Sequence, residues 1–408
     1  NIDNITIDFF RDCSKVENAA SCFVGRFGDK MNSKVLKREF WSYIPLNRKL
    51  RYSLRYNFQD IQDSDWDADV FYDMTELTDA FRMFWGARNL GNSYPSTLFA
   101  NNTKLTNVKE TFIEWDLTEI KQGLFENNPL INDFQRTFHQ YSVSVGKSIP
   151  QDLFASNTAS NVNLDTVFSE LRDIETIPSR IFAGLDAIEI EYCFNKIYDL
   201  ITVPSDVFEG ISDYSKITNL RGIFNGCESL VSIPENTLSN FTSAQTLERA
   251  FYQCVSLQEI NIDFSVFNDL TNISSMFYDC KEVENAVPRL WENPQYTTYN
   301  DCFKNCTKAL NYPEIPISWG GTNDGSITRL GFYIDENGYA DSNSVQNGGE
   351  TSWLVHNGAN EEPSVGDTIY QDYEPSTDVF IGLDKYYAIK GDKWIRISNL
   401  GVVTEKGN

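Results

Sequence analysis

The stretch "FYDCKEVENA" (residues 277–286) nearly repeats "FRDCSKVENA" (residues 10–19). Phenylalanine, cysteine and valine stand at the same spacing in both stretches, although most of the chain separates them. A spacing kept over such a separation indicates an internal repeat, because stacked units must each fit their neighbours in the same way.

A phenylalanine of this kind, here called the anchor, recurs through most of the chain in steps of 26 to 30 residues. The anchors are Phe58, Phe84, Phe112, Phe138, Phe168, Phe194, Phe224, Phe251, Phe277 and Phe303, with Phe10 in the same column before one irregular unit. In "FNGCESLVSIP", which starts at Phe224, Cys227, Leu230 and Ile233 follow at three-residue steps. The pattern therefore predicts a stacked array over residues 1–319.

Each unit has two parts with different patterns. Before the anchor, apolar residues such as Leu270, Ile273 and Met276 have helical spacing, which predicts a short helix or 3₁₀ turn. After it, a Leu-x2-Ile segment followed by proline is short and β-branched, which favours a strand. The predicted fold is an α/β solenoid of about 11 to 12 units, each a helix or 3₁₀ turn plus a short parallel strand.

Two stretches carry a family resemblance. "LTNISSMFYDCKEV" (residues 270–283) and "LRGIFNGCESLVSIP" (residues 220–234) resemble the BspA-like leucine-rich repeats of bacterial surface proteins. That resemblance implies a curved solenoid with parallel rungs on one face, in a family associated with adhesion and recognition. Near the C-terminus, residues 365–407 resemble a short module of gut-bacterial phage proteins, including tail and fibre proteins, and of their hosts.

The repeat stops near residue 320, which suggests a domain boundary. "GGTNDG" (residues 320–325) has the composition of a loop, and alternating stretches such as "KYYAIK" and "DKWIRIS" follow it. We expect a leucine-rich-repeat solenoid over residues 1–319, a linker over 320–326 and a small β-rich module over 327–408.

The candidate binding residues lie eight positions after the anchors. They are Asn18, Asn92, Thr176, Thr202, Ser232, Glu259, Asn285 and Asn311. This column is polar where the positions six and nine after the anchor are mostly apolar, as expected for the outer side of a rung. The column is either a solvated surface alone or a shallow hydrogen-bonding surface for a glycan or a protein.

Five cysteines lie three positions after an anchor. They are Cys13, Cys227, Cys254, Cys280 and Cys306, and other units carry Leu171, Ile197, Ala87 or Trp115 at this position. A position that accepts leucine or tryptophan belongs to the core, so we expect buried free thiols and no metal ligands. A disulfide from Cys302 to a neighbouring unit stays open.

The densest acidic run, "DSDWDADVFYD" (residues 63–73), begins like a calcium-binding loop. Ala68 stands where such a loop needs glycine, and Met74 stands where it needs glutamate. Alternation predicts Asp65, Asp67 and Asp69 on one face and Trp66, Ala68 and Val70 on the other. A solvated face is favoured, with a weak cation site as the alternative.

No motif for catalysis is present. The two histidines, His139 and His356, have no nucleophile or metal-ligand motif beside them. We therefore predict no enzymatic activity, no cofactor and no metal, although paired carboxylates for glycan cleavage need no local motif. Trp85, Tyr252 and Tyr278 directly follow anchors, where a ring can stack on a sugar or pack half-buried against the array.

The charge balance limits the partners. With 34 Lys and Arg against 58 Asp and Glu, the net charge is −24, and no basic cluster suits nucleic acid. No apolar stretch approaches the roughly 18 residues needed to insert into a membrane. We expect a recognition or adhesion protein on a virion surface, such as a phage tail fibre, or alternatively a secreted bacterial cell-surface adhesin. Its expected partners are a host-surface glycan or protein and other virion or surface proteins; homo-oligomerisation and a spacer role stay open.

Overall fold

The computed structural model describes residues 6–23, 33–54, 65–87, 94–115, 117, 119–140, 148–323, 330–334, 352–356, 369–370, 385–389, 393–398 and 402–407. The chain divides into two compact units. The first unit comprises residues 1–257 and 261–277, and the second comprises residues 258–260 and 278–408. The predicted division at residues 319–327 stays a prediction.

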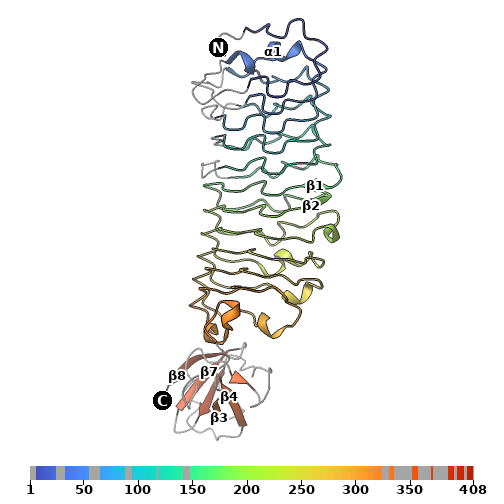
Figure 1. Cartoon of the computed structure of the whole chain (residues 1–408). Coiled ribbons are helices and arrows are strands. Elements are labelled where there is room, and N and C mark those ends of the chain that lie inside the picture. The colour runs from blue at the N-terminus through green and yellow to red at the C-terminus, as the bar shows by residue number, and fades with distance from the viewer. Residues whose placement is uncertain are drawn as a thin grey trace. The chain divides into compact units, whose positions relative to one another are not determined.

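The first unit is a solenoid whose successive coils pair in parallel (Figure 1). Isolated parallel bridges join Lys49, Asp79, Asn107, Asp133 and Asn163 in turn, and further along they join Asn219, Thr246 and Asn272. Between these runs, strand β1 (Val162–Asn163) pairs in parallel with β2 (Ala187–Glu189). Each of these isolated bridges lies five residues before an anchor, so the main ladder precedes the anchor. A shorter run of parallel bridges, Thr176 to Thr202 to Ser232, lies eight residues after an anchor, in the segment predicted as a strand.

The segment around each anchor is a run of turns. Of the two forms predicted before the anchor, the 3₁₀-type turn is observed in the described coils and the helix is not. The amides of this segment donate to the next coil at every second residue. Around Phe84, for example, Ala80, Arg82, Phe84 and Gly86 donate to the carbonyls of Asn107, Lys109, Thr111 and Ile113 over 2.9 to 3.1 Å. Turn bonds within the coil, such as Met83 N–H to the Ala80 carbonyl (3.0 Å), close every three residues. These turns give apolar residues a three-residue spacing, which resembles that of a helix.

Left-handed residues make these turns possible. Two residues before the anchors, Tyr52, Arg82, Glu110, Arg136, Thr166, Tyr192, Gly222, Arg249 and Ser275 all have φ between 51° and 60°. Only glycine adopts this conformation without strain, yet eight of these nine positions carry a side chain. The hydrogen bonds between coils hold the side-chain-bearing residues in this conformation.

The anchors form a continuous buried stack. Phe84, Phe112, Phe138, Phe168, Phe194, Phe224, Phe251 and Phe277 follow one another with ring centroids 5.3 to 6.0 Å apart and ring planes within 15° of parallel. All eight are buried. The predicted anchor column is confirmed over this range, because one large flat side chain per coil fills the same space in every coil.

A second aromatic column occupies the other corner of the coils. Trp41 meets Phe71 edge-on at 5.6 Å, and Phe71, Phe99 and Phe125 stack in turn with centroids 6.1 to 6.3 Å apart. Phe154, Phe182 and Phe208 stack further along at 5.9 Å. Phe10 belongs to this column, with its ring 5.9 Å from that of Trp41.

The assignment of Phe10 to the anchor column is therefore wrong. The amides of Ser21 and Tyr52 donate to the next coil as that of Arg82 does, so by register Phe23 and Leu54 take the first two anchor positions. The predicted anchor Phe58 lies outside the described residues.

Short helices lie between the ladder segments of the first unit. They are η2 (Ser33–Leu36), α1 (Arg38–Ser42), η4 (Tyr214–Lys216), η5 (Glu235–Leu238) and η6 (Phe264–Val266). The carboxylates of Asp213 and Asp263 cap η4 and η6 by accepting from the amides of Ser215 and Ser265. In the part of the chain that the structure describes, no helix is long and apolar enough to cross a membrane.

Among its described residues, the second unit has three further 3₁₀ helices and six strands. The helices are η7 (Leu290–Glu292), η8 (Tyr312–Glu314) and η9 (Ile317–Trp319). Strands β3 (Leu330–Ile334), β4 (Ser352–His356) and β5 (Ile369–Tyr370) form one antiparallel sheet, and β6 (Lys385–Ile389), β7 (Lys393–Ile397) and β8 (Val403–Gly407) form another.

The start of the predicted linker is hydrogen-bonded. The Asn323 amide donates to the Ile315 carbonyl (3.0 Å), and Gly320 has φ 93° with Lys304 so close that a Cβ would lie 2.6 Å from its backbone nitrogen. Residues 324–326 lie outside the described residues.

Candidate functional site

Residues that alternate with the buried ones around each anchor form an outward surface on the first unit, here called the ladder face. It comprises the residues five, three and two positions before each anchor and one position after it. Most of these are half-buried or exposed, and the buried ones are Asp79, Glu110, Ile113, His139, Ser169, Asn195 and Gly222. At three before the anchor stand Arg51, Phe81, Lys109, Gln135, Asp165, Glu191, Arg221, Glu248 and Ser274, and all nine are half-buried. The backbone ladder fixes where these side chains start, while their chemistry changes from coil to coil.

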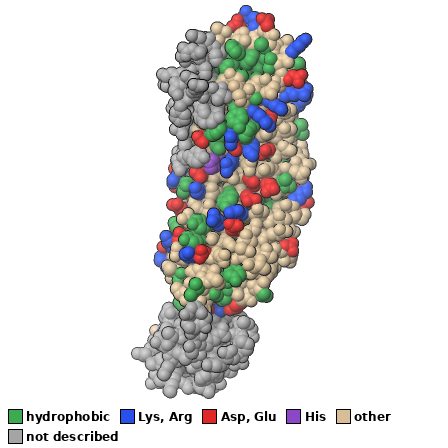
Figure 2. Space-filling model, in the orientation of Figure 1, with side chains coloured by type: hydrophobic (Ala, Val, Ile, Leu, Met, Phe, Trp, Pro, Cys, Tyr) green, Lys and Arg blue, Asp and Glu red, His purple; other side chains and the backbone are tan. Residues whose placement is uncertain are grey.

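Figure 2 shows that acidic, basic and hydrophobic side chains are interspersed along the face of the molecule in view. Many charged residues pair between neighbouring coils. Arg51 pairs with Asp79 (2.5 Å), and Arg221 pairs with Glu248 (3.0 Å). Such pairs give the ladder face donors and acceptors side by side, and a surface of this kind favours a partner with both.

An aromatic cluster lies toward the N-terminal end of the ladder face. It consists of Tyr52, Phe81 and Trp85 with Arg51 and Arg82, and all five are half-buried. The rings of Tyr52 and Phe81 lie 5.3 Å apart, and those of Tyr52 and Trp85 lie 6.4 Å apart. The Arg82 guanidinium lies 4.5 Å from the centre of the Trp85 ring and 5.0 Å from that of Phe81. The half-buried packing considered for Trp85 is thus observed.

A carboxylate cluster lies in the middle of the ladder face. One oxygen each from Asp165, Glu189 and Glu191 lies within 4.8 Å of the others, and all three residues are half-buried. Asp165 Oδ1 accepts from the Glu191 amide (3.0 Å), and Asn219 Nδ2 donates to Glu191 Oε1 (2.5 Å). Burial and the charges of Glu191 and Glu189 raise the pKa of Asp165 to about 7.

By donor chemistry the carboxylate cluster could hold a hard cation such as Ca²⁺, because three carboxylates supply the oxygen ligands that it prefers. No motif in the sequence predicts this cluster. Asp165 comes from one coil and both glutamates come from the next, so no local motif connects them. The signal available was the repeat register, which aligns Asp165 with Glu191.

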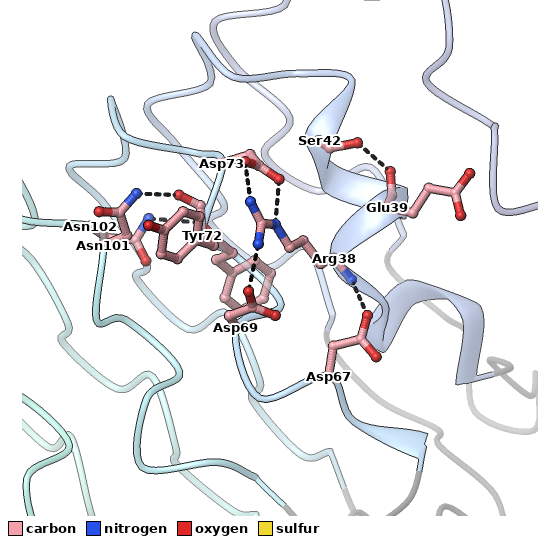
Figure 3. A network of polar contacts seen from close by, with 10 residues as sticks. Arg38, Glu39, Ser42, Asp67, Asp69, Tyr72, Asp73, Asn101 and Asn102 are labelled. Atoms are coloured by element: carbon pink, nitrogen blue, oxygen red, sulfur yellow. Dashed lines mark hydrogen bonds and ion pairs between the residues drawn. The ribbon is translucent and has the colours of Figure 1, made fainter.

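The acidic run is mostly engaged by arginine (Figure 3). The guanidinium of Arg38, in α1, pairs with Asp73 (2.7 Å) and Asp69 (2.7 Å), and its backbone amide donates to Asp67 (2.7 Å). The predicted alternation holds for Trp66 and Val70, which are buried, and is wrong at Ala68, which is exposed because the run forms turns. The half-exposed carboxylates of this solvated face also form the ion-pair network that joins it to α1.

The predicted binding column is only partly brought together. Parallel bridges join Thr176, Thr202 and Ser232, so these three form a short rung. Asn18, Thr176, Thr202 and Asn285 are exposed, Ser232 and Glu259 are half-buried, and Asn92 lies outside the described residues. Asn311 is wrong as a solvent-facing residue: it is 1% exposed. Its side chain accepts from the Val287 amide and donates to the Val287 carbonyl, which requires burial.

The thiols are structural. All eight cysteines are free, and Cys227, Cys254, Cys280 and Cys306 are buried as predicted, whereas Cys13 is only half-buried. The Cys227 thiol donates to the Phe194 carbonyl (3.1 Å), and burial raises its pKa to about 12. His139 is buried too, and burial lowers its pKa. The side chain of His356 lies outside the described residues.

A groove of about 800 Å³ lies away from the anchors, between residues 119–122, 148–155 and 180–183. Ile120, Ile149 and Ile181 line it together with the polar side chains of Gln122 and Arg180. The side chain of Arg180 pairs with Glu209 (2.9 Å).

The comparisons with known proteins cover part of the chain. Residues 191–314, 124 of the 408, match a family described as "Mycoplasma protein of unknown function, DUF285". No curated protein matches the chain. One similar solved structure is "Structure of the Toll - Spatzle complex, a molecular hub in Drosophila development and innate immunity", with 17% identity and a TM-score of 0.25 over 64% of this chain and 38% of that one.

These similarities assign no activity. The chain spans less than two fifths of the matched structure, and a TM-score of 0.25 supports no argument from it. The family match falls where the repeats are most regular and does not reach residues 365–407. The resemblance of that segment to phage modules therefore stays a prediction.

Proposed function

We propose that the chain is a non-enzymatic recognition protein displayed on a cell surface, and that the ladder face binds its partner. One observation carries this proposal: a backbone that repeats from coil to coil presents half-buried side chains of changing chemistry at fixed positions. Rigid scaffolds with variable outward residues suit the binding of an extended partner.

A bacterial cell surface is preferred to a virion as the location. The family match lies within repeats whose pattern resembles the BspA-like surface proteins. The virion alternative rests on the resemblance of residues 365–407 alone. A large negative charge suits either setting, because it keeps an aromatic-rich surface protein soluble.

The test is cell binding by the labelled full chain, measured by flow cytometry on a panel of epithelial and bacterial cells. Lys109→Ala and Arg221→Ala change the ladder face, and each is expected to weaken binding about fivefold or more. Glu126→Ser and Asn240→Ser change exposed residues outside it and serve as matched controls. Equal binding by all four variants, or by no cell type at all, would overturn the proposal.

Glycan cleavage at the carboxylate cluster is a second candidate. Asp165 and Glu191 are close, and the raised pKa of Asp165 suits a general acid. The cluster lies on a half-exposed face, however, where water is not excluded from a reacting bond. Release of oligosaccharide from capsular polysaccharide by the wild type, lost in Asp165→Asn, would establish cleavage and reject the binding-only function.

A further inference from the structure

The cationic groups of the aromatic cluster are already neutralised within the protein. Arg82 pairs with Glu110, and Arg51 pairs with Asp79. Arg82 also donates to the Tyr52 hydroxyl (3.4 Å). An anionic ligand would have to displace these carboxylates, and a cationic ligand would have to displace the guanidinium from the rings. Both substitutions are unfavourable, which leaves a neutral ligand.

The remaining chemistry is that of angled apolar ring faces with polar edges. The Tyr52 ring lies 5.3 Å from that of Phe81 at 79° and 6.4 Å from that of Trp85 at 51°, so three half-buried rings gather around one place on the ladder face. At the edges, the guanidinium groups of Arg51 and Arg82 can donate hydrogen bonds, and the carboxylate of Asp79 can accept them. A pyranose has the same division, with C–H groups on a ring face and hydroxyl groups at its rim.

We propose that the aromatic cluster of Tyr52, Phe81 and Trp85, edged by Arg51 and Arg82, is a binding site for neutral glycans. The sugar stacks a C–H face on the rings while its hydroxyls bond to the paired arginines and carboxylates. This assignment rests on the proposed recognition function and names the ligand class for one part of the ladder face.

The ladder offers a matched control elsewhere. Tyr252 and Arg249 form a pair in a different coil, with the guanidinium 5.5 Å from the ring centre. The pair has the same two residue types as the aromatic cluster. Tyr252→Ala therefore removes an aromatic side chain of the ladder face without touching the proposed site.

The experiment is calorimetric titration of the full chain with maltohexaose, cellohexaose, laminarihexaose and mannohexaose. At least one hexaose is expected to bind with a Kd of about 1 mM or lower. Trp85→Ala and Tyr52→Ala should each weaken that binding about tenfold, and Tyr252→Ala should leave it within about twofold. No binding of any hexaose up to about 10 mM, or undiminished binding by both cluster variants, overturns the assignment.

Two further measurements keep the test decisive. If a cluster variant does not fold, saturation transfer from the aromatic protons of the unmodified protein should concentrate on the C–H protons of one sugar face; uniform transfer would overturn the assignment. If no hexaose binds while cell binding still depends on Lys109 and Arg221, the glycan assignment fails and the proposed function stands. Hexaose binding without any cell binding would reject the proposed function instead.

Discussion

Residues 10–19 and 277–286 share seven of their ten letters and occupy different corners of the coil. Phe277 is an anchor, stacked on Phe251 with centroids 5.3 Å apart and planes 6° from parallel. Phe10 belongs to the second column, where its ring meets Trp41 at 5.9 Å and 34°. The backbones differ as well, since Asp279 has φ 63° and its counterpart Asp12 is not among the left-handed residues of the described chain.

The comparison shows that both corners obey one rule. Each is built from turns that close every three residues: the Cys13 amide donates to the Phe10 carbonyl (2.8 Å), and the Cys227 amide donates to that of the anchor Phe224 (3.2 Å). Apolar residues at three-residue steps satisfy either corner. The pattern of buried residues therefore identifies the repeat, but it does not show which of the two aromatic columns a given phenylalanine belongs to.

The largest expected effect comes from removing the two phenylalanines. Phe277→Ala should lower the free energy of unfolding by about 3 to 5 kcal/mol, because a fully buried ring is lost from a stack. Phe10→Ala should cost at least about 1 kcal/mol less, since Phe10 is 6% exposed and the rings of Phe9, Phe40 and Trp41 meet it edge-on or tilted and not stacked.

Urea unfolding followed by circular dichroism measures both losses, with Phe→Leu at each position as the volume control. Equal losses for the two alanine variants would show that Phe10 and Phe277 are equivalent anchors after all.

A smaller effect is expected at the cysteines of the same two stretches. Cys280 is buried and Cys13 is half-buried. Cys280→Ser should lower the free energy of unfolding by about 1 to 3 kcal/mol because it buries a hydroxyl, whereas Cys13→Ser should cost less than about 0.5 kcal/mol. Maleimide labelling of the native wild type, read by peptide mapping, should modify Cys13 and spare Cys280. The reverse order of labelling would contradict the assignment of corners.

The repeat was predictable from sequence where one letter dominates a column. Phenylalanine at eight consecutive anchors from Phe84 to Phe277 revealed the stack, and the cysteines behaved as core residues because Leu171 and Ile197 share their position. The anchor position at Leu54 could not be identified from the sequence, because leucine stands there in place of phenylalanine. Before the anchors the 3₁₀-turn alternative is observed and the helix alternative is not, and the sequence could not separate them because turns that close every three residues and a helix place apolar residues at similar spacing.

The candidate site was less predictable, because outward positions do not repeat. The aromatic cluster joins Tyr52 of one coil to Phe81 and Trp85 of the next. Of these three residues, the sequence pattern singles out only Trp85, which directly follows an anchor. Asn311 looked exposed by register, yet its amide satisfies the backbone of Val287. The register between coils decides which outward side chains contact one another. That register is set by the hydrogen bonds of the backbone ladder, which the sequence pattern does not predict.

The smallest expected effect tests this lesson at an outward position, Asp165. Its pKa of about 7 lies above the value near 3.9 of an unfolded chain, so between these values the folded protein binds a proton that the unfolded chain does not. Its contribution to stability is thus present in full below about pH 3.9 and is lost as pH rises from there to about 7. The free energy of unfolding of Asp165→Asn in urea should match that of the wild type below about pH 3.9, and its excess over the wild type should be about 1 kcal/mol larger near about pH 8 than near about pH 5, after a reduction for a partly exposed carboxylate.

Asp269→Asn removes an exposed carboxylate outside the cluster and controls for the overall charge of −24, which both variants reduce equally. Its difference from the wild type should stay constant between about pH 5 and pH 8, because the proton uptake belongs to Asp165 beside Glu189 and Glu191. A parallel pH dependence in all three proteins would mean that the carboxylates do not interact in solution. The register that brings Asp165 close to Glu191 would then be wrong. The conclusion that the register between coils decides which side chains are neighbours on the ladder face would be wrong as well.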